Sequence, residues 1–556
     1  MNPRNIGSLC VWAIAGVMAV VVSGARAQPA PAGGDKEAEI AQLKRRLAEL
    51  EGAKAPAAPG QAAAQAPSSA PLVLLEQSPL VVKDAAGAPV VADAAGKGID
   101  GVKLSQHDMR IGSPSIAVAP DGSIHVAFVE QHRTSPFANF VYHRSSADGG
   151  KTWTEAKNLS EDMPNIDVGL CKVLADSHNR VYVIWRAGLG LNFVANIDPT
   201  GDRTNIWFRE LEGGKWSKAK LVSEEATNMS QPDAAFSYFA AVDGAGNAQV
   251  LWNVLPDKWH PELMTLNPPP SPPGSRTHCN GIQMGLVFQS TLDGATAGKP
   301  REAFLAAITP APAGQAWVGP SCDGLNTLNG YVDTAGAPHF IAAVSMRKDG
   351  LGAHASHFEL IENGKAGQMI DLPNASFHEW RDIPTLLVDA KGKRHMIALY
   401  LAGEHPSVRD YPLGSDEEPT VIRAAVGLNG QIIGFQAYQG PGGRMAAVIQ
   451  TNDTGDPHGG DTYLTTSTGD GKWGPLVNVT NNAGRKTSLN KQTSVESRVM
   501  FDTSCLPGPG AVAFDKDGHL LLLLVKQEYK IVHSVALGVV IAGGDTITPT
   551  LRFLRF

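Results

Sequence analysis

The sequence predicts an all-β protein folded as a β-propeller, with seven blades favoured over six. Three observations predict it. A strand–turn–strand unit recurs along the chain, its strands are short and rich in β-branched and aromatic residues, and no helical periodicity separates them after residue 110. A period of about 50–60 residues with several strands per unit is typical of propeller blades. A ring of small sheets buries both faces of each sheet and leaves only short edges.

The recurring unit is a turn bearing Asp and Gly, followed by a strongly apolar strand. Six copies have their turns at 119–122, 176–179, 243–246, 333–336, 389–392 and 515–518. The last interval is about twice the usual one, and Gly440–Gly443 before Met445–Gln450 supplies a seventh copy. Leu520–Val525 is apolar on both faces, which predicts an inner strand packed between blades. Either Leu72–Val82 or the C-terminal Leu551–Phe556 is expected to complete the last blade.

The N-terminus predicts export. Arg4, an apolar stretch from Val11 to Val22 and the small-x-small motif Ala25–Ala27 predict a signal peptide over residues 1–27, and so a periplasmic or secreted protein. The apolar stretch is shorter than the ~20 residues that span a bilayer, so no transmembrane segment is expected in the mature chain.

Residues 28–71 are expected to be a tether. Ile40, Leu43, Leu47 and Leu50 form one stripe of a short amphipathic helix, and an Ala/Pro-rich linker follows it. Weak self-association through this helix and a lone helix on a tether both stay open. The propeller is then expected to occupy residues 72–556.

Composition limits the partners. With 47 Lys+Arg against 54 Asp+Glu, the net charge of −7 argues against a nucleic-acid partner. Four cysteines follow the signal peptide, namely Cys171, Cys279, Cys322 and Cys505. In an exported protein they allow three disulfide pairings, and free buried thiols are an equal alternative.

The most specific motif is Ser146–Trp153, which fits S-x-D-x-G-x-T-W at every position. Its Asp is expected to accept backbone N–H groups, its Gly to permit positive φ and its Trp to pack against a neighbouring hairpin. Weaker copies are Ser467–Trp473 and Glu212–Trp216. The motif resembles the Asp-box, or BNR repeat, of the sialidase-like propellers, and the resemblance implies a glycan as ligand or substrate.

The resemblance also implies a catalytic set: three arginines that grip the substrate carboxylate, a Tyr–Glu pair and an Asp acid. Arg110 stands in Met109–Pro114, with Met for the usual aromatic residue and two extra residues before Pro. Arg381 stands in Trp380–Pro384. Both arginines are candidates for the carboxylate clamp, because guanidinium pairs with carboxylate in a bidentate manner. A structural ion pair at a blade end is the alternative.

The remaining members of that set are ambiguous. Asp121, Glu130 and Asp148 follow Arg110 as candidate acids, although Asp121 and Asp148 belong to turns. Tyr438, Tyr463 and Tyr529 are late tyrosines, and no spacing rule selects one.

His378 and Glu379 join Arg381 in a five-residue acid/base and aromatic cluster, His378–Asp382, suited to sugar binding or proton transfer. A polar rim is the alternative for this cluster. Polysaccharide lyases on related propellers use His, Tyr and Arg on uronates. The histidines that loops supply here are His132, His143, His354, His357, His405 and His458.

No metal and no cofactor are expected. The loop Asp453–Asp461 is acidic, but it lacks EF-hand spacing and is interpreted as a solvated hairpin. Asp257–Gln283 is interpreted as an insertion, either a lid or a surface loop. Its His278 and Cys279, with His260, lack the spacing of metal ligands.

The sequence therefore predicts an exported propeller that acts on or binds a glycan or anionic sugar in its central funnel, as a sialidase-like exo-glycosidase with Arg110, Arg381, Glu379 and His378 as candidate catalytic residues. A non-catalytic carbohydrate- or protein-binding propeller and a uronate polysaccharide lyase are the alternatives.

Overall fold

The structure is a computed structural model. It describes residues 82–83, 89–90, 102–106, 111–132, 135–163, 166–189, 204–222, 238–254, 285–306, 329–333, 335–348, 353–363, 365–372, 384–400, 406–425, 431–452, 461–467, 469–479, 488–490, 495–502, 511–536 and 539–556. The chain divides into two units, Met1–Pro71 and Leu72–Phe556, and every described residue lies in the second. The predicted signal peptide, amphipathic helix and linker lie outside the described residues. Within the described ranges, no helix has the length and apolar character needed to cross a bilayer.

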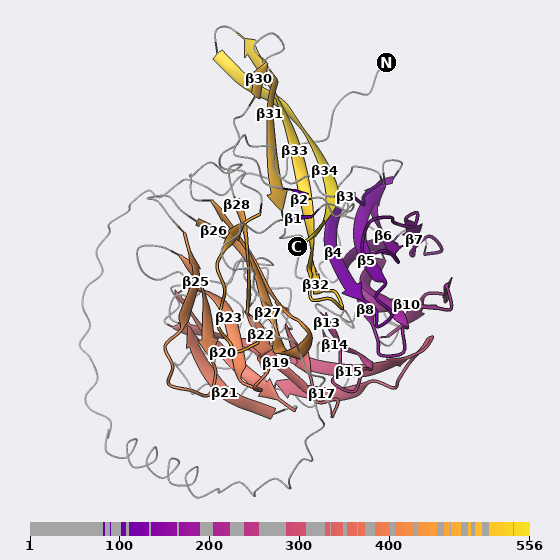
Figure 1. Cartoon of the computed structure of the whole chain (residues 1–556), viewed down its shortest axis with the longest axis vertical. Coiled ribbons are helices and arrows are strands. Elements are labelled where there is room, and N and C mark those ends of the chain that lie inside the picture. The colour runs from indigo at the N-terminus through magenta and orange to yellow at the C-terminus, as the bar shows by residue number, and fades with distance from the viewer. Residues whose placement is uncertain are drawn as a thin grey trace, which may run out of the picture. The chain divides into compact units, whose positions relative to one another are not determined.

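The fold is an all-β, seven-bladed propeller, which confirms the predicted fold class and the favoured blade number (Figure 1). The strands of the first four blades are β4 (Ile111–Val118), β5 (Ile124–His132), β6 (Ser135–Ser146) and β7 (Lys157–Asn158) in blade 1; β8 (Ile166–Ala175), β9 (Val181–Leu189), β10 (Thr204–Glu212), β11 (Lys215–Trp216) and β12 (Lys220–Leu221) in blade 2; β13 (Tyr238–Val242), β14 (Ala248–Val254), β15 (Gly285–Asp293), β16 (Thr296–Ala297) and β17 (Arg301–Ala306) in blade 3; and β18 (Asn329–Val332), β19 (Pro338–Lys348), β20 (Ala353–Glu362) and β21 (Lys365–Leu372) in blade 4.

The last three blades follow the same plan, with blade 7 enlarged. Their strands are β22 (Thr385–Val388), β23 (Arg394–Tyr400), β24 (Ser407–Pro412) and β25 (Thr420–Ala424) in blade 5; β26 (Gln431–Gln439), β27 (Met445–Asn452), β28 (Asp461–Ser467) and β29 (Val477–Asn478) in blade 6, with the 3-10 turn η2 (Pro441–Gly443); and β32 (Val512–Phe514), β33 (Leu520–Ala536) and β34 (Val539–Arg555) in blade 7, joined by β1 (Val82–Lys83), β2 (Pro89–Val90), β3 (Val102–Lys103), β30 (Ser488–Asn490) and β31 (Val495–Asp502).

Successive blades contact one another around the ring, and blade 7 contacts blade 1 through β32, β33, β34 and β4. Figure 1 shows the sheets following each other in chain order from indigo to yellow. Apolar side chains from neighbouring sheets make the cores between blades. The largest fully buried side chains among them include Trp185, Trp252, Tyr182, Phe128 and Phe208.

An N-terminal strand completes blade 7. Val102 and Lys103 of β3 pair with Phe553 and Arg552 of β34. The backbone N–H of Leu104 donates to the carbonyl of Leu551 at 2.8 Å, and Leu104 is fully buried. Segments from near the two ends of the chain therefore share one sheet. β34, which contains all but the last residue of the predicted segment Leu551–Phe556, is the third strand of this blade.

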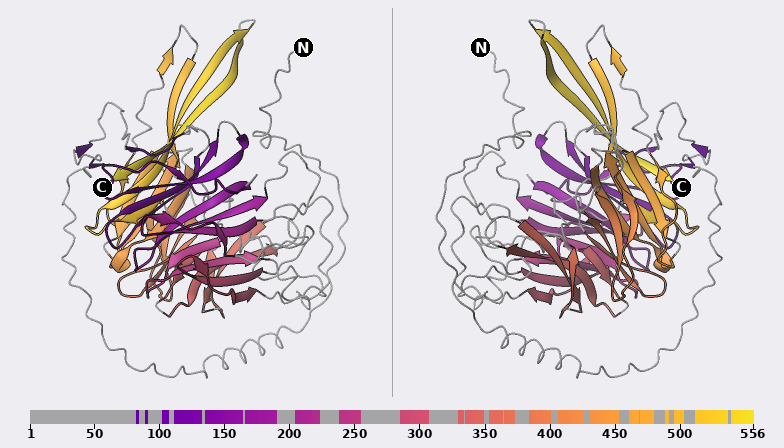
Figure 2. Two further views of the ribbon diagram at one scale, coloured as in Figure 1. Left: turned by 90° about the vertical axis from the view of Figure 1, so that its right-hand side faces the viewer. Right: turned by 90° about the vertical axis from the view of Figure 1, so that its left-hand side faces the viewer.

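Leu520–Val525 forms the buried start of β33, the second strand of blade 7. The prediction that it is an inner strand was wrong, because β32 lies inside it in the sheet. Its apolar character on both faces follows from packing between blades 6 and 1. Beyond Val525, β33 continues with β34, β31 and β30 as an arm that projects from the ring (Figures 1 and 2).

The predicted repeat turns are the hairpins between the first and second strands of the blades. In blade 2, for example, Asp176 accepts the backbone N–H groups of His178 and Arg180, and Asn179 has a φ of 61°. Neighbouring turns touch: the N–H of Ser177 donates to the carbonyl of Gly246, and that of Ala390 to Gly469. We call the surface that carries these turns the turn face. Because the sheets are antiparallel, the inner strands begin on the opposite surface, where β4 starts at Ile111 and β22 at Thr385. We call that surface the start face.

The turn Ser146–Trp153 joins β6 to β7 and has the geometry that its sequence predicts. Asp148 accepts the backbone N–H groups of Lys151 and Thr152 and the hydroxyl of Thr152, at 2.6 to 3.0 Å. These bonds, those from Thr152 above all, lower the pKa of Asp148. Trp153 contacts Phe553 of blade 7 edge-on, with ring centroids 5.0 Å apart. The weaker copies form the corresponding hairpins β10–β11 and β28–β29.

Candidate functional site

The four candidate catalytic residues Arg110, His378, Glu379 and Arg381 lie outside the described residues. The strands next to them are described. β4 begins one residue after Arg110, and β22 begins four residues after Arg381. Both inner strands start on the start face, so the flanking strand ends share one surface of the ring.

The structure separates the three candidate acids. Asp121 lies in the β4–β5 turn, where its carboxylate accepts the N–H and the hydroxyl of Ser123 at 2.8 and 2.7 Å. Asp148 lies in the β6–β7 hairpin, also on the turn face. Glu130 instead pairs across the sheet with Ile111, the first residue of β4. Glu130 is therefore the one of the three on the start face.

Glu130 is fully buried. Its Oε2 accepts the backbone N–H of Gln106 at 3.4 Å. Burial first, and the charge of Glu130 second, raise the pKa of the Tyr142 hydroxyl to about 12. Gln106 follows the segment 102–105 that closes blade 7, so this carboxylate links ring closure to the beginning of blade 1. The sequence named Glu130 as a candidate but offered no rule to prefer it.

Strained backbone marks the same end of blades 1 and 2. Ser113 and Leu170 have φ values of 48° and 44°, and the pairing register shifts at each position. The two extra residues before Pro114 are thus part of a β-bulge in β4. Non-glycine residues with positive φ concentrate at functional sites. The two extra residues in the arginine motif were visible in the sequence, but no β-bulge was predicted from them.

The next blade holds each bulge in place. The Cys171 thiol of blade 2 donates to the Ser113 carbonyl at 3.0 Å, and the Tyr238 hydroxyl of blade 3 donates to the Leu170 carbonyl at 2.8 Å. Cys171 is a free thiol, and burial raises its pKa, so it is unsuited to act as a nucleophile. Ser113 is also buried, and its hydroxyl has no hydrogen-bond partner within the described part of the chain.

The candidate tyrosines do not form a site in the described residues. Tyr438 is buried and its hydroxyl donates to Gln436. The Tyr463 ring lies under the guanidinium of Arg423, 4.3 Å from its centroid. Tyr529 lies on β33 in the projecting arm, paired with Arg498 and Ile547.

The histidines named for a lyase are dispersed. His143 is buried on β6 beside His125, with 3.1 Å between His143 Nε2 and His125 Nδ1. His132 lies on β5, and His354 and His357 lie on β20. His405, His458, His260, His278 and Cys279 lie outside the described residues, as does all of the Asp453–Asp461 loop except Asp461.

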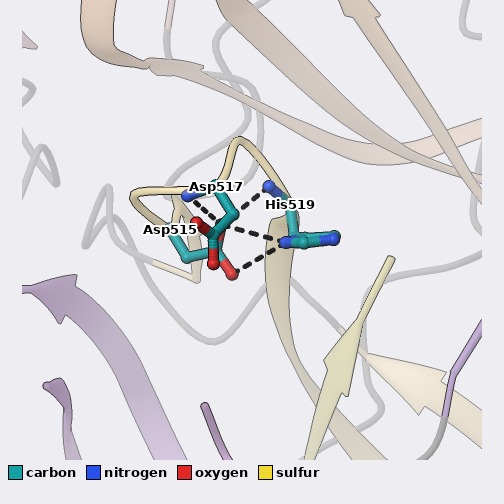
Figure 3. Close-up of side chains that lie close together, drawn as sticks. All are labelled: Asp515, Asp517 and His519. Carbon is teal, nitrogen blue, oxygen red and sulfur yellow. Dashed lines mark hydrogen bonds and ion pairs between the residues drawn. The ribbon is translucent and has the colours of Figure 1, made fainter. Parts of the chain in front are cut away.

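One group of described side chains has the composition of a metal site: Asp515, Asp517 and His519 in the β32–β33 turn (Figure 3). Asp515 uses one oxygen to accept the backbone N–H groups of Asp517 and His519 at 2.9 and 2.8 Å, as the repeat Asp does in other blades. Arg555 donates to the other Asp515 oxygen at 2.6 Å and lies 2.9 Å from Nδ1 of His519. A guanidinium thus supplies the positive charge, and the turn is explained as a structural hairpin.

Comparison with known proteins finds similar folds among carbohydrate-active propellers. No protein-family model matches the chain, and no curated relative matches it. A protein of unknown function from Dyadobacter fermentans is 13% identical, with a TM-score of 0.38, over 64% of this chain and 94% of that one. A polysaccharide lyase is 13% identical (TM-score 0.37; 66% of this chain, 78% of that one). The leech intramolecular trans-sialidase is 11% identical (TM-score 0.33; 83% and 70%). At these identities the likeness concerns the fold.

Proposed function

We propose that this protein is an exported glycan-active propeller of the Asp-box type that binds an anionic sugar on its start face and cleaves it in a sialidase-like reaction. The observation that carries the proposal is that β4 and β22, the inner strands next to Arg110 and Arg381, begin on the same face. Buried Glu130 of β5 pairs with Ile111, the first residue of β4.

The assigned roles follow from chemistry. Arg110 and Arg381 pair with the sugar carboxylate, because planar guanidinium groups bind carboxylates in a bidentate manner. His378 and Glu379 exchange protons with the glycosidic oxygen or with water. Glu130 accepts the N–H of Gln106 and pairs with Ile111, one on each side of Arg110 in the sequence, and acts as a positioning residue.

The test combines hydrolysis and binding. Purified protein is incubated with a panel of sialosides and uronate polymers, and released sialic acid and the absorbance of unsaturated uronates are followed. Arg110→Lys and Arg381→Lys are expected to lower turnover by at least about tenfold, since a lysine cannot form the bidentate pair. Arg301→Lys, the same substitution at an exposed arginine that contacts Gln289 and the Gly336 carbonyl on the turn face, is the matched control.

The outcomes separate the candidate functions. Release of sialic acid supports the proposal, and unsaturated products identify a uronate lyase instead. Glycan binding by calorimetry without either product identifies a binding module, which the Met109 substitution and the bulge at Ser113 favour as the second candidate. The absence of both binding and turnover across the panel would refute a glycan function.

The export proposal has its own measurement. Intact-mass analysis of protein secreted by its own host is expected to show a mature chain that begins at Gln28. A mature mass that includes Met1–Ala27 would refute cleavage.

A further inference from the structure

Blades 5 and 6 meet at a buried ionic cluster on the turn face. His395 of β23 is 2% exposed, and its Nδ1 lies 2.9 and 3.0 Å from the two carboxylate oxygens of Asp410 on β24. Its Nε2 lies 3.6 Å from Oδ2 of Asp389 in the β22–β23 turn. Asp410 and Asp389 are also buried, so one imidazole faces two carboxylates away from water.

Blade 6 is bound to this cluster. The indole N–H of Trp473 donates to Oδ2 of Asp410 at 2.7 Å. Gly471 lies against the imidazole so closely that a Cβ there would be 3.0 Å from Cε1 of His395. The carbonyl of Gly469 accepts the N–H of Ala390 next to Asp389. The carboxylate of Asp410 is thus shared by the histidine of its own blade and the tryptophan of the next.

The charges of the cluster depend on one proton. The charged groups that face the imidazole are Asp389 and Asp410 of blade 5, and Glu417 acts on it from further away while paired with Lys393 at 2.6 Å. The groups of blade 6 that contact the cluster, Gly471 and Trp473, are neutral. A protonated imidazole offsets one of the two buried carboxylates. A neutral imidazole offsets neither. Asp389 then keeps the N–H groups of Lys391 and Lys393, and Asp410 keeps the indole N–H of Trp473, but neither carboxylate faces a positive imidazole, which is unfavourable for buried charge.

We propose that His395 is a proton-dependent latch between blades 5 and 6, closed when the imidazole is protonated and weakened when it is neutral. Burial by itself lowers the pKa of His395, but the hydrogen bond and charge of Asp410, together with the charge of Asp389, outweigh it, and the pKa is raised above 6.5. A raised pKa means that the latch contributes its full stability below pH 6.5. That stability is lost as the pH rises through the folded-state pKa.

Hydrogen exchange read by mass spectrometry tests the latch at its own location. Peptides within 384–425 and 461–479 are compared with blade 3 peptides at about pH 6 and about pH 8.5, after correction for the intrinsic exchange rate. Protection of the blade 5 and 6 peptides is expected to fall by about tenfold per pH unit between 6.5 and the folded-state pKa, relative to blade 3. Equal behaviour of both sets of peptides would overturn the proposal.

Two variants localise the effect. His395→Gln is expected to remove the pH dependence of these peptides, and retention of that dependence would overturn the latch. Trp473→Phe keeps the histidine and both carboxylates, so it serves if His395→Gln does not fold. It is expected to reduce protection of the blade 5 and 6 peptides most at about pH 6, where the latch is closed. Protection equal to that of the wild type at both pH values would count against the latch.

Discussion

The junction between blades 1 and 2 and the junction between blades 5 and 6 place different chemistry at the same register positions. His125 and His395 occupy the same position of the second strand. Two residues further on, Ala127 pairs with His143, and Ile397 pairs with Asp410. In both junctions a tryptophan from the next blade covers the third-strand residue. Trp216 contacts His143 edge-on at 4.8 Å, and Trp473 hydrogen-bonds to Asp410.

The third-strand residue decides whether the buried histidine has a carboxylate partner. Beside Asp410, His395 is stabilised with its proton. Beside His143, burial lowers the pKa of His125 to about 4, and burial followed by the neighbouring imidazole lowers that of His143 further. Two buried imidazoles in contact share one bridging proton, and both stay neutral at neutral pH. The same position of the blade therefore supports junctions with opposite pH dependence.

Asp410→Ala is expected to have the largest effect on the difference between the two junctions. This change leaves His395 without its closest carboxylate and Trp473 without an acceptor, so unfolding at about pH 6 is expected to become easier by about 3–5 kcal/mol. His143→Ala, at the matching position, removes a neutral group and is expected to cost about 2 kcal/mol. Urea unfolding of both variants gives the two values. Equal losses would contradict the charged nature of the blade 5 and 6 junction.

Acid is expected to weaken the junction between blades 1 and 2 instead. The folded-state pKa of His125 is about 4, below the 6.5 of the unfolded chain, so the unfolded state binds the proton first as the pH falls. The cost grows from pH 6.5 downwards and reaches about 3 kcal/mol near pH 4. His125→Gln, chosen because Gln249 occupies the same position of blade 3, is expected to remove this loss. Melting temperatures of both proteins between these pH values measure the difference, and parallel curves would contradict it.

Much of the fold was predictable because each blade repeats its local turn chemistry. The positive φ values of Gly246, Gly336 and Gly392 follow directly from the repeat. The first copy lacks the repeat Asp itself. Ala119 occupies the position that Asp176 has in blade 2, since both donate their N–H across the same hairpin, and Asp121 lies two residues further on.

What the sequence could not supply depends on contacts between distant segments. The closing strand β3 is two residues long and carries no pattern, and only its pairing with Phe553 and Arg552 identifies it. The latch residues Asp410 and Trp473 belong to different blades, so the sequence around one does not indicate that the other is its partner. For the candidate site, the repeat predicted that β4 and β22 begin on the same side of the ring. The choice of Glu130 over Asp121 and Asp148 required the register of β5.

Replacing Trp473 and Trp216 one at a time by phenylalanine compares the hydrogen bond at one junction with the aromatic contact at the other. Trp473→Phe removes a donor from a buried carboxylate and is expected to cost about 2 kcal/mol. Trp216→Phe keeps an edge-on contact with His143 and is expected to cost about 1 kcal/mol. Urea unfolding at about pH 6 ranks the two. A larger loss for Trp216→Phe would show that aromatic packing, not the hydrogen bond, holds these junctions.

The junction between blades 7 and 1 provides a reference in which the third-strand residue is uncharged. Here Phe553 occupies the third-strand position, and Trp153 contacts it edge-on. Phe553→Leu is expected to cost about 1 kcal/mol. Since neither ring titrates, this cost is expected to be the same at about pH 5 and about pH 8, where the other two junctions change in opposite directions. A pH-dependent cost, measured by melting temperature, would mean that the pH response belongs to the ring as a whole. A cost that does not change with pH would assign the pH response to the histidines at the junctions between blades 1 and 2 and between blades 5 and 6.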